Sequence, residues 1–377
     1  MEVRNLGWYL LLSSVLILLA SCSTEDTELS NESQDRARVA AEDCKLKDLP
    51  GPDELHITGL IHFNINVRDY ERSREFYRAA GFIDQIGPFP ETNTIEVSRG
   101  VGIDKLYRLH AELIHLGKLP DGPIDLTIPT GRLVDLIDWK DPERLEPPYP
   151  AINHTGISYF SLRSDDIHTD MERLIKAGAT MAVGPVTTDF GAQVAMVRDP
   201  DGTFLKLHQQ PDAGSSGSEQ KIDYLNINVR DLECSRPFYE MLGLEVQDAS
   251  ELEETDPLAE ALGLGSETVK LGTSMRHRAD GFQVKLNQWV EPTTFGLPYP
   301  APLTHLGIHR INWASSNLES DIAVLKRHGV KFISPIAPCC DGDASTFGFI
   351  IFEDPDGIYN QMLGTITPPN QSRGYSD

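Results

Sequence analysis

The two halves of the chain carry the same short motifs in the same order. The repeated motifs are NINVRD at 64–69 and 226–231, PYP at 148–150 and 298–300, and DPDG at 199–202 and 354–357. The offset between copies stays between 150 and 162 residues. Self-similarity at a fixed period is the signature of repeated structural units. The sequence therefore predicts a duplication in which each copy helps to interpret the other.

Residues 1–21 are predicted to be a signal peptide that is not part of the fold. Leu6 to Ala20 is a nearly unbroken apolar run, short for a membrane span, and it ends in Leu19-Ala20-Ser21-Cys22. This tetrapeptide resembles the lipobox of bacterial lipoproteins, in which the cysteine is diacylated and becomes the mature N-terminus. The resemblance implies a lipid anchor on Cys22. A plain secretory signal with an incidental cysteine is the alternative.

Residues 22–55 are predicted to be an acidic, flexible tether, because they are rich in Glu, Asp, Ser and Asn and lack apolar periodicity. With the lipobox, and with Ser rather than Asp at position 23, they place the protein in the bacterial cell envelope. We expect it on the outer membrane, facing the periplasm. The net charge of −24 excludes nucleic acid as a partner, since such a surface repels phosphate backbones. The sequence leaves the oligomeric state open.

Four more cysteines follow Cys22, at positions 44, 234, 339 and 340. A location outside the cytoplasm permits disulfides, but the spacing specifies no pairing. We interpret the adjacent Cys339 and Cys340 as two small loop residues, with a metal or redox pair as the alternative.

Each half divides again into two units with the order strand, helix and three further strands. In the first unit, the segment 59–67 alternates apolar and polar residues, as a two-faced strand does. Asp69 is placed to cap a helix over 70–80, which Gly81 ends. One such unit is too small to be stable alone, so two units are expected to pair. The predicted segments are a first domain at 56–210 with units 56–140 and 151–210, a linker at 211–220, a second domain at 221–366 with units 221–292 and 302–366, and a tail at 367–377.

The segment GLIHFNINVRDYERSREFY, the motifs LGLEVQ and LNQWVEP and the two DPDG turns resemble the vicinal oxygen chelate superfamily. That group includes glyoxalase I, bleomycin-resistance proteins, fosfomycin-modifying enzymes and extradiol dioxygenases. The resemblance covers residues 57–365. It implies an α+β fold of four βαβββ modules that form two domains, each a U-shaped, curved mixed sheet with outer helices around a cup. Function depends on the residues in the cup rather than on the fold.

The resemblance also implies which side chains face the cups. Metal-dependent members take ligands from the first and the last strand of each unit. The matching positions are His62, Tyr159, Tyr224 and Arg310 on first strands, and Asp135, Lys206, Lys285 and Gln361 on last strands. Protonated Lys and Arg are not metal ligands, because they have no lone pair to offer.

The choice of partner for each unit decides the composition of each cup. Short loops within each half favour pairing of neighbours, which would put His62, Asp135, Tyr159 and Lys206 in one cup. The other cup would then hold Tyr224, Lys285, Arg310 and Gln361. Neither set is a convincing metal site. Alternatively, the first unit pairs with the fourth, which would gather His62, Asp135 and Gln361 beside Arg310 as a possible site for Zn, Ni, Mn or Fe.

Cups lined by Tyr, Lys, Arg and Gln suit a small anionic or phenolic molecule. We therefore predict a membrane-anchored glyoxalase- or bleomycin-resistance-like protein that binds a small organic ligand without a cofactor or a complete metal site. The alternative is a metal-dependent lyase, isomerase or transferase of the glyoxalase I type. An extradiol dioxygenase is disfavoured, because the second half lacks the pattern of two His and one Glu.

Whether the protein is an enzyme stays open at this point. In an enzymatic version, His62 beside Asp135 would act as a general base and Lys206 would stabilise an oxyanion. In a purely structural version, Asp135 and Lys206 would form a buried ion pair and His62 would be a core histidine.

Overall fold

The computed structural model describes residues 48–122, 125, 128–143, 146–188, 190–211, 221–248, 251–254, 257–265, 268–339 and 345–367. The predicted signal peptide with Cys22, most of the tether and nearly all of the linker and tail lie outside these residues. Within the described ranges, no helix is long and apolar enough to span a membrane.

The secondary structure follows the predicted units. After a short 3₁₀ helix, η1 (Pro52–Glu54), the first unit contains β1 (Ile57–Val67), α2 (Tyr70–Ala79), β2 (Phe82–Ile86), α3 (Ile95–Gly100), β3 (Arg108–Leu116) and β4 (Leu133–Asp141). The second unit contains β5 (Gly156–Arg163), α4 (Ile167–Lys176), β6 (Thr180–Thr187), β7 (Gln193–Arg198) and β8 (Phe204–Gln209).

The second half repeats this plan. The third unit contains β9 (Ile222–Asn228), α5 (Leu232–Met241), β10 (Leu244–Val246), β11 (Glu251–Glu254), α6 (Pro257–Ala261), β12 (Val269–His277) and β13 (Gln283–Glu291). The fourth contains β14 (Gly307–Ser315), α7 (Leu318–Arg327), β15 (Ala337–Cys339), β16 (Phe347–Glu353) and β17 (Tyr359–Thr365). The predicted cap of the first long helix is confirmed, because the Asp69 side chain accepts a hydrogen bond from the Arg72 amide.

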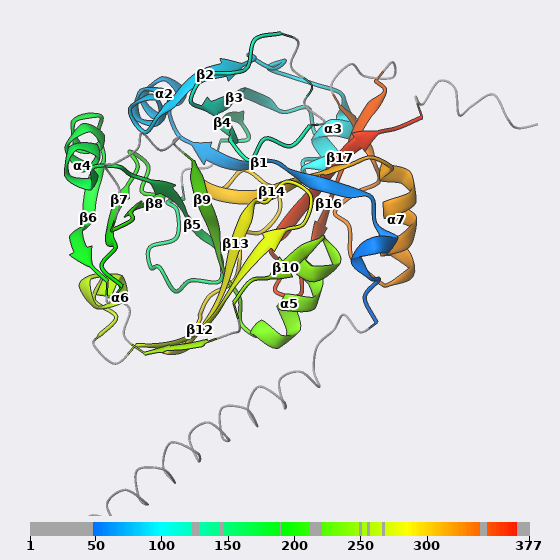
Figure 1. Ribbon diagram of the computed structural model, residues 1–377. Coiled ribbons are helices and arrows are strands. Elements are labelled where there is room, and N and C mark those ends of the chain that lie inside the picture. Colours follow the sequence, from blue (N-terminus) through cyan, green and yellow to red (C-terminus); the bar gives the residue numbers. More distant parts are fainter. Residues whose placement is uncertain are drawn as a thin grey trace, which may run out of the picture. The chain divides into compact units, whose positions relative to one another are not determined.

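Two mixed sheets are built from these strands (Figure 1). The eight-stranded first sheet has the order β15-β16-β17-β14-β1-β4-β3-β2. The nine-stranded second sheet has the order β10-β12-β13-β9-β5-β8-β7-β6, and β11 pairs with β12 beside this path. In both sheets the two units meet through antiparallel first strands, β1 with β14 and β5 with β9. This is the α+β arrangement of paired βαβββ modules that the sequence predicts.

The expected pairing of neighbouring units is wrong. The first unit shares its sheet with the fourth, and the second with the third, so neither sheet coincides with 56–210 or 221–366. A short loop requires only that the two strands it joins end close together. Here the loop from β4 to β5 and the loop from β13 to β14 each carry the chain from one sheet to the other. The crossovers meet at the PYP motifs, where the rings of Tyr149 and Tyr299 stack with centroids 3.9 Å apart. Each backbone amide donates to the phenol oxygen of the other tyrosine, at 2.9 and 3.0 Å.

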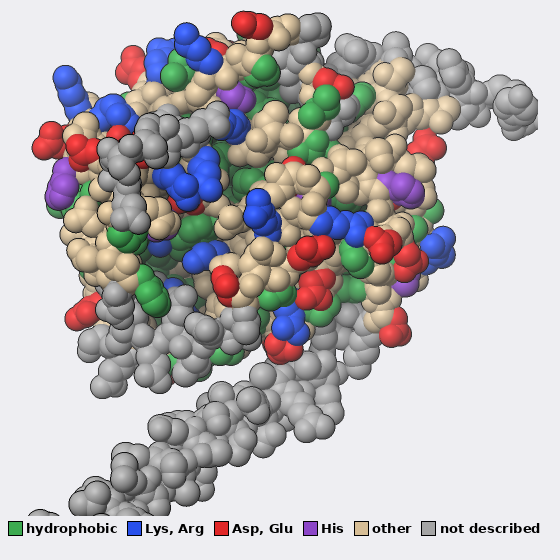
Figure 2. Space-filling view, viewed as in Figure 1, with side chains coloured by type: hydrophobic (Ala, Val, Ile, Leu, Met, Phe, Trp, Pro, Cys, Tyr) green, Lys and Arg blue, Asp and Glu red, His purple; other side chains and the backbone are tan. Residues whose placement is uncertain are grey.

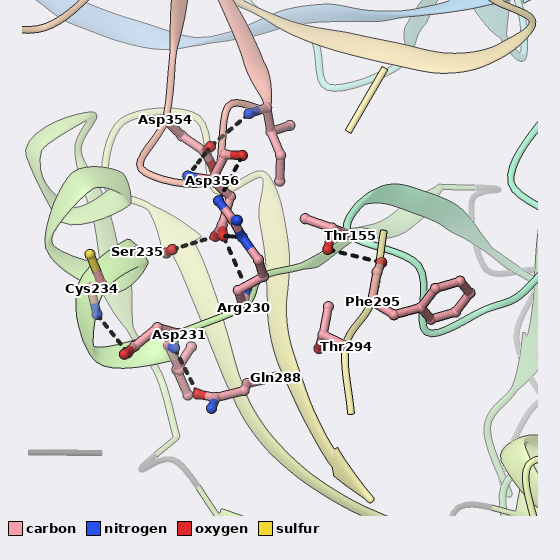
Figure 3. A network of polar contacts seen from close by, with 12 residues as sticks. Thr155, Arg230, Asp231, Cys234, Ser235, Gln288, Thr294, Phe295, Asp354 and Asp356 are labelled. Atoms are coloured by element: carbon pink, nitrogen blue, oxygen red, sulfur yellow. Dashed lines mark hydrogen bonds and ion pairs between the residues drawn. The ribbon is translucent and has the colours of Figure 1, made fainter. Parts of the chain in front are cut away.

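Neighbouring units are joined instead through the DPDG turns. In the second half, the Tyr239 hydroxyl on α5 donates to Asp354 at 2.9 Å. Arg230 and Ser235 each bind Asp356 at 2.8 Å (Figure 3). The first half repeats this contact, since the Tyr77 hydroxyl donates to Asp199 at 2.8 Å. The motif therefore fastens the last turn of one unit to the helix of the unit before it.

Strand alternation gives each sheet one apolar face and one cup face. Along β1, Phe63 and Ile65 are fully buried in the main core, which also contains Phe76 and Tyr77 of α2. His62 lies on the opposite face of β1. Two smaller apolar clusters lie in the cups, one around Trp139 and the other around Trp289. The core thus fixes the strands whose other face carries the candidate functional residues.

Candidate functional site

The structure brings the eight cup positions together in two sets. The cup of the first sheet holds His62, Asp135, Arg310 and Gln361. The cup of the second sheet holds Tyr159, Lys206, Tyr224 and Lys285. The predicted sets based on neighbouring units are therefore wrong, and the alternative pairing of first and fourth units is the observed one. A buried ion pair between Asp135 and Lys206 is excluded, because these residues belong to different sheets.

A cavity of about 410 Å³ lies in the first cup. This volume is in the range of sites for small organic ligands. The four predicted cup residues lie on β1, β4, β14 and β17, close to the seam between the two units. Much of the remaining wall is apolar and includes Phe89, Val97, Leu109, Ile137, Trp139, Phe347, Phe349 and Leu363.

His62 on β1 is held as a neutral imidazole. The side-chain amide of Asn312 donates to its Nε2 at 2.8 Å, which places the ring proton on Nδ1. Burial, reinforced by the positive charge of Arg310, lowers the pKa of His62 to about 3. Nδ1 has no hydrogen-bond partner among the described residues. His62 can therefore donate to a ligand but is a poor general base.

Asp135 on β4 is the titratable acid of this cup. Its Oδ2 accepts a 2.6 Å hydrogen bond from the side-chain amide of Asn64, while Oδ1 is buried and lacks a described partner. Burial raises the pKa of Asp135 to about 6, although Arg310 and the bond from Asn64 act in the opposite direction. The carboxyl group can therefore exchange a proton near neutral pH, and it is better suited than His62 to act as a base.

Arg310 on β14 supplies a buried positive charge. Its Nε donates to Oε1 of Gln361 at 2.6 Å, and its side chain is only 5% exposed. Burial lowers the pKa of Arg310 to about 10, so the guanidinium remains protonated at neutral pH. Nη1 has no described partner, and no carboxylate of the described residues lies within 4.0 Å of the guanidinium. The group has hydrogen-bonding capacity left for a ligand.

The donor set of this cup does not fit a divalent metal. Among the described residues, no group of three or more His, Cys, Asp and Glu side chains could hold an ion. The amide oxygen of Gln361 already accepts from Arg310. The guanidinium repels a cation, and its charge contributes to lowering the pKa of His62. The three candidate metal ligands, His62, Asp135 and Gln361, therefore surround the guanidinium of Arg310 and not an empty metal site.

Several residues of this site were missed in the sequence. Asn64 and Asn312 each lie two positions after a predicted cup residue, and strand alternation alone would have placed them on the same face. Tyr107 also lines the cavity, and burial, with a contribution from Asp135, raises its pKa to about 12. Cys339 lies on the wall and is disulfide-bonded, as is Cys234, so its interpretation as a simple loop residue is wrong.

The comparisons with known proteins agree with this architecture. The family model of the Glyoxalase/Bleomycin resistance protein/Dioxygenase superfamily matches residues 120–207 and 221–362. A solved mutant of glyoxalase I from Zea mays is 17% identical with a TM-score of 0.51, covering 82% of this chain and 95% of that chain. A glyoxalase family protein from Bacillus cereus is 18% identical with a TM-score of 0.35, covering 41% of this chain and 99% of that chain. No curated protein sequence matches the chain.

At 17% identity, the likeness to the Zea mays structure concerns the fold alone. The family model, in contrast, spans more than half of the sequence and includes parts of both halves. The chain belongs to the glyoxalase, bleomycin resistance protein and dioxygenase superfamily.

Proposed function

We propose that the first cup binds a small organic anion with an apolar body, and that it does so without a metal ion. The observation that carries this proposal is the buried guanidinium of Arg310, whose Nη1 lacks a described partner on the wall of a mostly apolar cavity. A buried donor without a partner costs about 1–3 kcal/mol. A carboxylate that accepts from Nη1 would remove this cost and add a charge-assisted hydrogen bond.

The other polar atoms of the cup favour a ligand that also carries a hydroxyl group. Asp135 Oδ1 is an acceptor and His62 Nδ1 is a donor, and both lack a described partner. A phenolic or aliphatic hydroxyl could donate to the former while the apolar body contacts Trp139 and Phe349. Hydroxylated aromatic acids have this combination of groups and are small enough for a cavity of about 410 Å³.

A metal-dependent lyase, isomerase or transferase is a weaker alternative, because Arg310 lies among the groups that would have to bind the metal. If the cup is catalytic, Asp135 is the residue to accept a proton, since burial raises its pKa to about 6. His62, whose pKa is lowered to about 3 mainly by burial, would position the ligand instead.

We further propose that the protein acts at the cell envelope through a lipid anchor on Cys22. The support is the sequence Leu19-Ala20-Ser21-Cys22 at the end of the apolar run. Cells grown with labelled palmitate should incorporate label into the wild-type chain but not into Cys22→Ala. Equal labelling of both chains would contradict the anchor.

Calorimetric titration of the full chain with 4-hydroxybenzoate tests the ligand class. We expect saturable binding that Arg310→Met weakens at least about tenfold, the equivalent of one lost charge-assisted hydrogen bond. The matched control is Lys176→Met, which removes one positive charge from the exposed end of α4. Benzyl alcohol, which lacks the anionic group, should bind weakly to all three chains. Equal affinity of wild type and Arg310→Met for 4-hydroxybenzoate would overturn the proposal.

A further inference from the structure

The second cup contains a compact cluster of lysine and tyrosine side chains. Lys206 on β8 donates to the hydroxyl of Tyr224 on β9 at 2.9 Å. The ammonium of Lys285 on β13 lies 4.9 Å from the centroid of the Tyr224 ring. The ring of Tyr159 on β5 completes the group, with its centroid 6.1 Å from that of Tyr224. Side chains from three strands of the sheet therefore surround the ring or hydroxyl of Tyr224 on a fourth strand.

No carboxylate of the described residues balances the charges of this cluster. Within the described ranges, no acidic side chain forms an ion pair with Lys206 or Lys285, although the chain carries a net charge of −24. Asp223, the neighbour of Tyr224 in the sequence, lies on the other face of β9, where it pairs with Arg163 and His208. The two ammonium groups thus face a side chain that can itself become negative.

The phenol responds to these charges. Burial alone raises the pKa of Tyr224, but the positive charges of Lys206 and Lys285 and the hydrogen bonds from Lys206 and Tyr159 outweigh it. The pKa of Tyr224 therefore lies below its usual value of 10. When Tyr224 ionises, its phenolate becomes the internal counter-charge of the two lysines.

We propose that the second cup is a separate binding site for a small oxyanion, held by Lys206, Lys285 and the Tyr224 hydroxyl. Where Tyr224 is ionised, the entering oxyanion replaces the phenolate as the counter-charge, and the phenolate takes up one proton from solvent. The neutral hydroxyl can then donate a hydrogen bond to the bound anion. No covalent bond forms or breaks other than this O–H bond.

The surroundings of the cluster are compatible with a ligand. Apolar side chains, including Met196, Phe204 and Trp289, pack around Tyr159 and Tyr224. Lys206 and Lys285 are partly exposed, whereas Tyr224 is 5% exposed. The surface is hollowed over the second sheet, and basic side chains border the hollow (Figure 2). The oxyanion can be a free phosphate or the phosphate or carboxylate group of an organic molecule, which the test below distinguishes.

The test is a near-ultraviolet titration of the full chain, followed on the long-wavelength side of the tyrosine band, where phenolate absorbs much more strongly than phenol. Burial raises the pKa of the seven other tyrosines for which a shift is resolved, so they should not ionise below pH 10. Tyr9, Tyr159 and Tyr375 contribute equally to the wild type and to Tyr224→Phe, so the difference between the two titrations isolates Tyr224. We expect this difference to show an ionisation below pH 10. Inorganic phosphate should move the step to higher pH, because it binds the protonated form.

Direct binding of phosphate, followed by calorimetry, provides the second measurement. Lys206→Met and Lys285→Met should each weaken binding at least about tenfold, whereas the charge-matched Lys176→Met should not. Above the Tyr224 ionisation, affinity should fall about tenfold per pH unit, since one proton is taken up. Replacing phosphate by phenyl phosphate or by acetate shows whether an organic body or a carboxylate is preferred.

The results of these two measurements test the second cup independently of the first. A wild-type titration that coincides with that of Tyr224→Phe below pH 10 would overturn the inference, and so would a Tyr224 step that phosphate, phenyl phosphate and acetate all leave in place. Unchanged far-ultraviolet circular dichroism of Tyr224→Phe would show that the variant is folded. Both titration results leave 4-hydroxybenzoate binding at Arg310 untested, so that each proposal can fail independently.

Discussion

The side-chain amide of Asn312 donates a 2.8 Å hydrogen bond to Nε2 of His62, although the two residues are 250 positions apart in the chain. This bond crosses the seam between β14 and β1, where the fourth unit meets the first. It fixes the imidazole as the neutral form with its proton on Nδ1. The properties of the first cup therefore depend on residues from both copies of the duplicated sequence.

Replacing Arg310 should convert the first cup into a metal site. Arg310→His removes the cation, frees Oε1 of Gln361 and provides a third strong ligand beside His62 and Asp135. We expect Arg310→His to bind one equivalent of Zn²⁺ with micromolar affinity, measured by calorimetry with metal analysis. The matched control is Tyr159→His at the equivalent position of the second cup, which should not gain Zn²⁺ because Lys206 and Lys285 lie there. Stoichiometric metal in the purified wild type would contradict the metal-free cup.

Binding of 4-hydroxybenzoate should strengthen as the pH falls through about 6. Above this pH Asp135 is ionised and repels the carboxylate, and below it the acid is neutral, because burial raises the pKa of Asp135 to about 6. Asp135→Asn should bind about tenfold more tightly than wild type at pH 8, the equivalent of one pKa unit. Its affinity should also vary little between pH 5 and pH 8. An unchanged pH profile in Asp135→Asn would assign the titration to another group.

The two DPDG turns should make stability depend on pH in different windows. Burial raises the pKa of Asp199 to about 6 and that of Asp354 to about 8, both from 3.8. A raised pKa in the folded state means that the folded protein binds the proton more tightly, so this stabilisation is present at low pH and lost as the pH rises through the folded value. Denaturant unfolding should show that Asp199→Asn removes a decline between pH 4 and 6. Asp354→Asn should remove one that extends to about pH 8.

The contact between each DPDG turn and the helix of the unit before it offers a matched test of hydrogen-bond strength. Ser235 Oγ donates to Asp356 at 2.8 Å, whereas the equivalent Ser73 Oγ lies 3.5 Å from Asp201. Both serines are fully buried, so their substitution removes the same chemical group from similar surroundings. Ser235→Ala should lower the free energy of unfolding by about 1–3 kcal/mol, and Ser73→Ala by less than about 1 kcal/mol. A larger loss in Ser73→Ala would show that these distances do not rank the two bonds.

The repeated motifs predicted the fold because their residues make contacts that hold the strands and loops together. Asn66 in the first NINVRD motif accepts from the indole of Trp139, and Asn228 accepts in the same way from Trp289, both at 3.1 Å. Such contacts recur wherever the architecture recurs, so a comparison of the two copies finds them. The order of elements and the helix caps follow from local patterns that need no partner.

The pairing of units and the composition of the cups could not be predicted in this way. Loop length constrains how far a chain end can travel, but not which free strand edge it meets. The cup residues are also the positions at which the copies differ, since Asp135 of one corresponds to Lys285 of the other. Their chemistry depends on cross-sheet neighbours such as Asn312 for His62, which sequence spacing alone does not reveal.

The nested pairing of units has a consequence for dissecting the molecule. Because each sheet takes one unit from either side of the segment 211–220, cutting the chain there yields two fragments with unpaired first strands, β1 and β5 in one and β9 and β14 in the other. Neither fragment alone can assemble a ligand pocket of the kind seen in the intact chain. The two pieces would have to recombine, as in a reciprocal domain swap, and both binding sites would be restored or lost together.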